Sequence, residues 1–206
     1  MDITTIFWEI GGVILSNGWD TAARERAAVK FGLDRDDYGQ RHDMAVTELE
    51  TGQITLDEYL EQTVFCRPRE FSRQSFKDFM FEQSRPIDGT LDVLAEVAQV
   101  AAARGYLLGT LNNESRELNE FRLDKFGLRQ CFSVYVCSSF LGVMKPAPAI
   151  FRIALDLVQA DPATVLMIDD RPLNVEAAAR AGMRTIHFRD APQLRAELKS
   201  VIPAGS

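Results

Sequence analysis

The sequence predicts an α/β fold, in which a parallel sheet carries helices on both faces and a block of helices is inserted after the first strand. Two observations support this prediction. Short apolar segments alternate with helical patterns along most of the chain, and the alternation stops between residues 17 and 86, where no convincing strand occurs. The 206 residues are 46% hydrophobic, which suits a core domain with a smaller inserted one.

Five segments have the apolar, β-branched or aromatic character of buried strands. The first is IFWEIGGVIL at residues 6–15, and the others span 106–111, 132–138, 164–169 and 184–188. Helical patterns follow at 90–104, 115–126, 148–159, 173–181 and 192–199. Prolines near helix starts and glycines after helix ends mark their boundaries. Because strands and helices of this length alternate, the strands are expected to be parallel.

The inserted block reads as four helices, at residues 20–31, 34–50, 55–65 and 72–83. The segments GLD and TGQIT break the helical pattern, and Thr55 with Glu58 forms a candidate capping box. The sequence therefore predicts a core made of residues 1–16 and 87–206 and a helical insert at 17–86.

Charge and cysteine usage narrow the class of protein. The net charge is −7 and no run of five or six basic residues occurs, which argues against a nucleic-acid or membrane partner. No signal-peptide pattern opens the chain, and no apolar run approaches the roughly 18 residues that span a bilayer. The cysteines Cys66, Cys131 and Cys137 form no C-x-x-C pair and are interpreted as free thiols. A cytoplasmic protein is expected.

Polar residues gather where the predicted strands end. Ligands of open parallel sheets bind beyond the carboxyl ends of the strands. The polar groups that follow four of the five strands are Glu9, Asn112 with Asn113, Lys145, and Asp169 with Asp170. Each alone is typical of a turn, a helix cap or a solvated loop. Together, each after its own strand, they indicate a functional site.

Four segments resemble the motifs of the haloacid dehalogenase-like hydrolases: FWEIGGVIL, TLNNES, GVMKPAPAIF and MIDDRPLNVEAA. The last two are highly specific in combination. The resemblance covers nearly the whole chain and implies a Rossmann-like core with a small α-helical cap after the first strand. Within the family, the sequence is most similar to sugar-phosphate phosphatases and to the phosphatase domain attached to epoxide hydrolases.

The resemblance implies a Mg²⁺-dependent phosphatase acting on a small phosphorylated metabolite. The carboxylate at Glu9 would attack the phosphoryl group and form an acyl phosphate, which water then cleaves. Mg²⁺ would be held by Glu9, by the backbone carbonyl of Gly11 and by Asp170, with Asp169 acting alongside.

The same resemblance assigns the remaining polar groups. Lys145 would neutralise the nucleophile and the phosphate, and Asn112 and Asn113 would bind phosphate oxygens. Asn174, one helical turn beyond Asp170, would brace these groups or cap its helix.

Three positions depart from the family pattern. Asn112 stands where Ser or Thr is usual, and its amide can donate to phosphate as a hydroxyl does. Gly11 replaces a second aspartate that serves as general acid and base, a loss that typically costs about 10²–10⁴ in rate. Glu9 replaces the nucleophilic aspartate and moves the carboxylate by more than about 1 Å, which can cost roughly 10²-fold. An engineered replacement and a natural loss of catalysis both explain Glu9.

Two other functions are weighed against the phosphatase. One is a catalytically silent module on the same fold that binds a phosphorylated ligand or a protein. The other is a 2-haloacid dehalogenase, which also lacks the second aspartate. Dehalogenases need no metal and use no aspartate pair in the fourth motif, so MIDDRP argues against that function.

The cap is expected to set substrate choice because it covers the carboxyl edge of the sheet. Trp19, Arg41, His42 and Glu48 are candidates to face the pocket, although Arg41 and His42 are more typical of solvated or capping residues. The aromatic residues Phe71, Phe76, Phe79 and Phe81 are typical of a cap core, or of a subunit contact in a homodimer.

Overall fold

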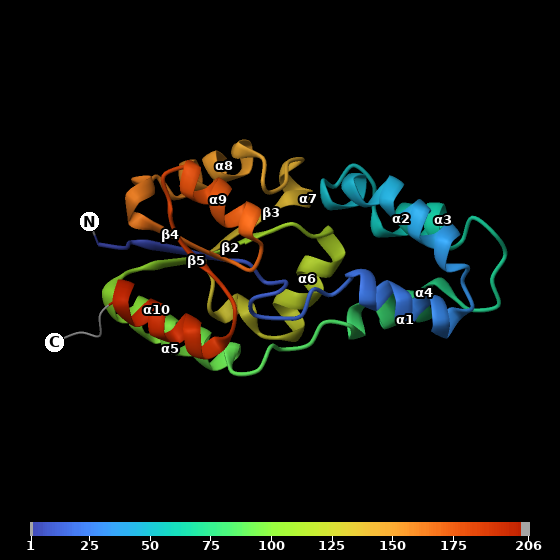
Figure 1. Cartoon of the computed structure of the whole chain (residues 1–206), viewed down its shortest axis with the longest axis horizontal. Coiled ribbons are helices and arrows are strands. Elements are labelled where there is room, and N and C mark those ends of the chain that lie inside the picture. Colours follow the sequence, from blue (N-terminus) through green and yellow to red (C-terminus); the bar gives the residue numbers. More distant parts are fainter. Residues whose placement is uncertain (1, 203–206) are drawn as a thin grey trace.

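The sheet of the computed structural model, which describes residues 2–202, has five parallel strands. They are β1 (Thr5–Trp8), β2 (Leu107–Asn112), β3 (Val134–Cys137), β4 (Val165–Asp169) and β5 (Arg184–His187), in the order β3-β2-β1-β4-β5 (Figure 1). The predicted α/β class and parallel sheet are confirmed. β1 lies at the centre between β2 and β4, so its carboxyl end is the switch point at which such folds bind ligands.

Helices cover both faces of this sheet. Side chains of β1 alternate between the faces, as strand geometry requires. Ile6 and Trp8 pack in a cluster with residues of α5 (Thr90–Arg104) and α10 (Ala191–Val201), and α6 (Arg116–Lys125) adds to the same cluster. Phe7 packs on the other face, with α8 (Pro148–Val158) and α9 (Pro172–Arg180) (Figure 1).

Four helices follow β1 and form a group with its own core. They are α1 (Thr21–Phe31), α2 (Arg35–Glu50), α3 (Leu56–Thr63) and α4 (Arg73–Glu82), and Figure 1 shows them beyond the carboxyl ends of the strands. The predicted capping box between Thr55 and Glu58 is present. Phe76 is fully buried in the cluster that these helices form, and Phe71, Phe79 and Phe81 pack against it. The aromatic set therefore builds the core of this group, which we call the cap.

The cap joins the rest of the fold through two segments that run side by side. The backbone N–H of Ser16 donates to the carbonyl of Arg85 at 2.8 Å, and that of Ile87 donates to the carbonyl of Ile14 at 3.0 Å. The domain boundaries between residues 16 and 17 and between 86 and 87 stay a prediction. The outermost residues of that division, 1 and 203–206, lie outside the described part of the chain.

Differences from the predicted elements occur at their ends. β1 stops at Trp8 because residues 10–15 form a tight loop, closed by a hydrogen bond of 2.7 Å from Gly12 N to Leu15 O. The predicted strand 132–138 is shorter and is followed by a short helix, α7 (Ser138–Leu141), that the sequence did not indicate. Among residues 2–202, no helix is both long and apolar enough to cross a bilayer.

Gly52, in the turn after α2, touches α7 of the core. Its φ is 69°, in the left-handed region, and a Cβ at this position would overlap the carbonyl oxygen of Ser139. We expect Gly52→Ala to lower the free energy of unfolding by more than Gly32→Ala does. Gly32 has a similar φ of 61° but open space around it. Gly32→Ala therefore carries only the cost of placing alanine in the left-handed conformation, about 1–2 kcal/mol. The overlap at Gly52 adds about 1–3 kcal/mol.

Urea unfolding of the two variants in parallel measures this difference. Equal losses would show that the turn moves away from α7 without cost, and that Gly52 is not needed to seat the cap.

Candidate active site

Glu9 emerges from the central strand into a buried site. Its backbone N–H still bonds to the carbonyl of Ile168 in β4 at 2.9 Å. One carboxylate oxygen, Oε2, is paired with Nζ of Lys145. The other, Oε1, accepts from the backbone N–H of Ile10 at 3.1 Å and of Gly11 at 3.3 Å. The carboxylate is thus held at the end of β1 by one ammonium and by its own loop.

Lys145 connects the ends of three strands. Its fully buried Nζ pairs with Glu9, with Asp169 Oδ2 at 2.6 Å and with the carbonyl of Leu111 at 2.7 Å. Three acceptors satisfy the three donors of an ammonium group. Burial opposes the charge on Lys145, but Glu9 and Asp169 outweigh it and raise the lysine pKa. Burial also raises the pKa of Glu9 to about 8, although Lys145 acts in the opposite direction.

The aspartate pair follows β4. Asp169 is buried, and its oxygens accept from the backbone N–H of Arg171 at 2.8 Å and from Nδ2 of Asn174 at 3.1 Å. Asp170 is half-buried and lies over Gly12, where a Cβ would overlap its carboxylate. Burial and the neighbouring Asp169 raise the pKa of Asp170. Glycine at position 12, with a φ of 80°, lets this second carboxylate approach the β1 loop.

The two asparagines after β2 lie in the same site but differ in their contacts. Oδ1 of Asn112 accepts from Ile10 N at 2.9 Å, whereas its buried Nδ2 has no partner in the described part of the chain. Asn113 donates to the carbonyl of Lys145 and accepts from its N–H, both at 2.8 Å. Asn113 therefore fixes the backbone of Lys145, whereas Asn112 holds the β1 loop through its oxygen and keeps an unpaired buried donor.

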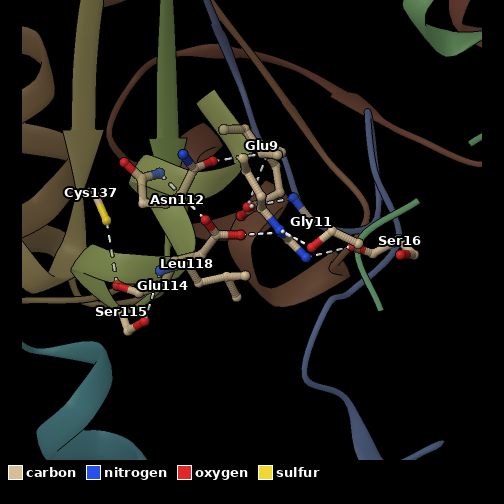
Figure 2. A network of polar contacts seen from close by, with 12 residues as sticks. Glu9, Gly11, Ser16, Asn112, Glu114, Ser115, Leu118 and Cys137 are labelled. Atoms are coloured by element: carbon tan, nitrogen blue, oxygen red, sulfur yellow. Dashed lines mark hydrogen bonds and ion pairs between the residues drawn. The ribbon is translucent and has the colours of Figure 1, made fainter. Parts of the chain in front are cut away.

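A buried ion pair beside this site was not predicted. Arg122 of α6 pairs through Nη1 with Glu114, and their side chains are only 1% and 5% exposed. Arg122 also donates from Nε to Ser84 Oγ at 3.0 Å and from Nη2 to the carbonyl of Ser16 at 2.8 Å. Figure 2 shows Glu114 and Ser16 in this network with Glu9 and Gly11. The sequence carries no local signal for this pair, because Arg122 lies on a helix rich in charged residues.

A cavity of about 400 Å³ lies between the cap and the strand ends. This volume falls within the range of small-molecule sites. The core contributes Glu9, Gly11, Asn113, Glu114, Arg171 and Asn174 to its wall, and the cap side contributes Trp19, Arg24, His42, Leu49 and Glu50 among others. Glu9 and Gly11 are thus accessible to a ligand that the cap covers.

Of the predicted cap candidates, Trp19 and His42 line the cavity. His42 is buried, and its Nδ1 lies 2.8 Å from the hydroxyl of Tyr59. Burial first, and then Arg24, lower its pKa to about 4, so the ring is neutral near pH 7. The expectation of a solvated or capping His42 is therefore wrong, because α3 brings Tyr59 against it. Arg41 instead pairs with Asp37 at 3.0 Å.

Glu50, at the end of α2, is a cavity residue that the sequence did not reveal. Burial raises its pKa to about 7, with Arg171 acting in the opposite direction. The folded protein therefore keeps a proton here at a pH where the unfolded chain has lost it. The stabilisation is complete well below pH 5 and is lost as pH rises through about 7.

We accordingly expect Glu50→Gln to become more stable relative to the parent chain as pH rises from 5 to 8. Urea unfolding at several pH values measures this trend, and Glu48→Gln, at an exposed position of the same helix, controls for the lost charge. Parallel stability curves for Glu50→Gln and the parent would contradict the shifted pKa.

Comparison with known proteins places this site in a family. Residues 3–182 match the family described as haloacid dehalogenase-like hydrolase. Flavin mononucleotide hydrolase 1 of Arabidopsis thaliana is 29% identical over 78% of this chain and 63% of its own length, so the match spans less than two thirds of that relative. Phosphoglycolate phosphatase of Aquifex aeolicus is 23% identical over 87% of this chain and 82% of its own.

Solved structures show the same fold. A haloacid dehalogenase-family enzyme of Bacteroides thetaiotaomicron, in complex with magnesium and inorganic phosphate, superposes with a TM-score of 0.75. It is 19% identical, over 91% of this chain and 95% of that one. The chain with Glu9, Lys145 and the aspartate pair at its sheet edge therefore belongs to the haloacid dehalogenase-like hydrolases and, by its curated relatives, resembles their phosphatase branch.

Proposed function

We propose that this chain is a phosphatase-type hydrolase of a small phosphorylated metabolite, with Glu9 at the position of the nucleophile. The observation that carries the proposal is the buried carboxylate of Glu9, paired with Lys145 at the floor of the cavity. The two curated relatives are named for flavin mononucleotide and phosphoglycolate, both small phosphorylated molecules.

Each group at the sheet edge has a role in this reaction. Glu9 attacks phosphorus and forms an acyl phosphate while the leaving group departs. Lys145 orients the carboxylate and balances negative charge on the transferring phosphoryl group, and the free Nδ2 of Asn112 binds a phosphate oxygen. Asn113 holds the backbone of Lys145 in place, and Asn174 holds Asp169. A phosphate contact of Asn113 through its second amide hydrogen stays a prediction.

The residues at this edge suit Mg²⁺. No three His, Cys, Asp or Glu side chains within residues 2–202 could hold a metal by themselves. Mg²⁺, however, commonly takes one or two carboxylates and completes its shell with water and phosphate oxygens. Glu9, Asp169 and Asp170 share this edge with the ammonium of Lys145, and Asp170 reaches over Gly12. Glu9, the Gly11 carbonyl and Asp170 would hold the ion, with Asp169 alongside, and the ion would neutralise charge developing on the phosphate.

One observation favours a catalytically silent phosphate-binding module instead. Both oxygens of Glu9 are already engaged, one by Lys145 and one by the N–H groups of Ile10 and Gly11. A carboxylate held in this way is poorly placed for in-line attack on phosphorus.

Metal titration separates the two candidates. Calorimetry should detect Mg²⁺ binding to the parent chain and its loss in Asp170→Ala, and phosphate release from a sugar-phosphate panel should stop when EDTA is added. Binding of Mg²⁺ and phosphate without turnover, even in Glu9→Asp, would favour the silent module. Chloride release from 2-chloropropionate without metal would exclude both.

A further inference from the structure

The structure fills the space beside Gly11 with another carboxylate. A Cβ built on Gly11 would lie 3.7 Å from Oε1 of Glu114 and 3.1 Å from Nη1 of Arg122. An aspartate side chain at position 11 would extend into this region. Glu114 thus places a carboxylate oxygen beside position 11, together with the guanidinium of Arg122, although it comes from the chain just after β2.

Glu114 is held in this position from several sides. Oε1 pairs with Arg122, Oε2 accepts from Nδ2 of Asn119 at 3.4 Å, and the backbone N–H donates to Ser138 Oγ at 3.1 Å. The residue is only 5% exposed, yet it lines the same cavity as Glu9 and Gly11. A carboxylate that is fixed, mostly dehydrated and open only to the ligand cavity suits a reaction with a bound water.

We propose that Glu114 is the general base of the second half-reaction, an inference that rests on the proposed phosphatase function. A water oxygen attacks phosphorus in the acyl phosphate on Glu9, and Glu114 takes one proton from that water. The bond between phosphorus and the Glu9 oxygen breaks, which releases inorganic phosphate and restores the Glu9 carboxylate. Glu114 then returns its proton to solvent.

The contacts of Glu114 favour a base over an acid. Both of its oxygens accept hydrogen bonds, from Arg122 and from Asn119, which is the bonding pattern of a carboxylate, and a carboxylate oxygen has a further lone pair that can take a proton from water. The first half-reaction therefore takes no proton from Glu114. An aryl phosphate, whose leaving group departs as an anion, isolates the second half-reaction.

Rapid mixing of p-nitrophenyl phosphate with Glu114→Gln, made in the Glu9→Asp background, tests this role. Glutamine keeps an oxygen that Arg122 can donate to, but it cannot take a proton. We expect a burst of about one nitrophenolate per protein at an unchanged rate, followed by turnover slowed by about 10²–10⁴. Glu117→Gln is the matched control, because Glu117 accepts from Leu56 N and is not itself one of the residues that line the cavity; it should show neither effect.

A rescue variant separates chemistry from folding. Gly11 is not among the glycines with positive φ, so Gly11→Asp is compatible with its backbone, and the flexible end of Arg122 can yield to it. Added to Glu114→Gln, it should restore turnover at least 10-fold. Equal slowing of burst and turnover, or no slowing, would overturn the role of Glu114 alone. If Glu9→Asp itself releases no nitrophenolate, the proposed function falls and the inference with it.

Discussion

Glu9→Asp is expected to raise Mg²⁺-dependent hydrolysis of p-nitrophenyl phosphate by roughly 10²-fold, since a displacement of about 1 Å at a reacting atom costs a factor of this size. The structure supplies a reason beyond length. The longer side chain lets Oε1 fold back onto the N–H groups of Ile10 and Gly11. Aspartate keeps its carboxylate one methylene closer to β1. Initial rates of nitrophenolate release for both chains, with Mg²⁺ and with EDTA, measure the gain.

Two variants in the Glu9→Asp background show whether the gained activity uses this site. Lys145→Ala and Asp170→Ala should each abolish it, because the first removes the partner of the proposed nucleophile and the second removes a proposed metal ligand. Lys77→Ala, which removes a half-buried ammonium from the cap, should leave it in place. An inert Glu9→Asp chain that still binds Mg²⁺ and phosphate would show that the site has lost more than its aspartate.

Lys145→Met is expected to lower the free energy of unfolding by about 3–5 kcal/mol at pH 7, because it leaves buried carboxylates without their cation. Lys145 is fully buried between Glu9 and Asp169, and methionine conserves most of its volume. The loss should be larger at pH 9 than at pH 7, because burial raises the pKa of Glu9 to about 8 and the group loses its proton between these two pH values. Urea unfolding at both pH values provides the measurement.

The control for the loss of a cation is an ion pair near the protein surface. Arg41→Met removes the half-buried partner of Asp37 on the cap, and ion pairs near the surface contribute little to stability. The double variant Glu9→Gln, Lys145→Met should recover part of the lost stability, since one unpaired charge is gone. A loss below about 1 kcal/mol in Lys145→Met would mean that the ammonium of Lys145 does not stabilise the fold.

Local sequence patterns predicted the architecture because the elements obey local rules. The alternation of strands and helices predicted the parallel sheet. The four cap helices begin at residues whose side chains cap them, which are Asp20, Asp34, Thr55 and Ser72. Ligands of parallel sheets bind beyond the carboxyl ends of the strands, and this rule predicted that the polar residues after four strands lie close together. The catalytic and binding roles of these residues stay predictions.

Tertiary partners decided what the sequence could not show. From the sequence, Arg122 is expected to be solvated, because its helix is polar. Its burial is compensated by the ion pair with Glu114 and by hydrogen bonds to Ser16 and Ser84. His42 is likewise expected to be solvated from its local sequence, and it is buried because Tyr59 of another helix hydrogen-bonds to its ring. Such residues are identified by partners that lie far away in the sequence, which no local pattern contains.

Arg122 also limits how substrate can reach the cavity. Its guanidinium bonds to Ser16 in the segment that leaves the sheet and to Ser84 in the segment that returns. Pulling either segment away would leave one buried N–H group of the guanidinium without its acceptor, at a cost of a few kcal/mol. The cap is therefore expected to swing as one body about a pivot at these two serines, so that substrate enters by rotation of α1–α4 while the attachment itself stays closed.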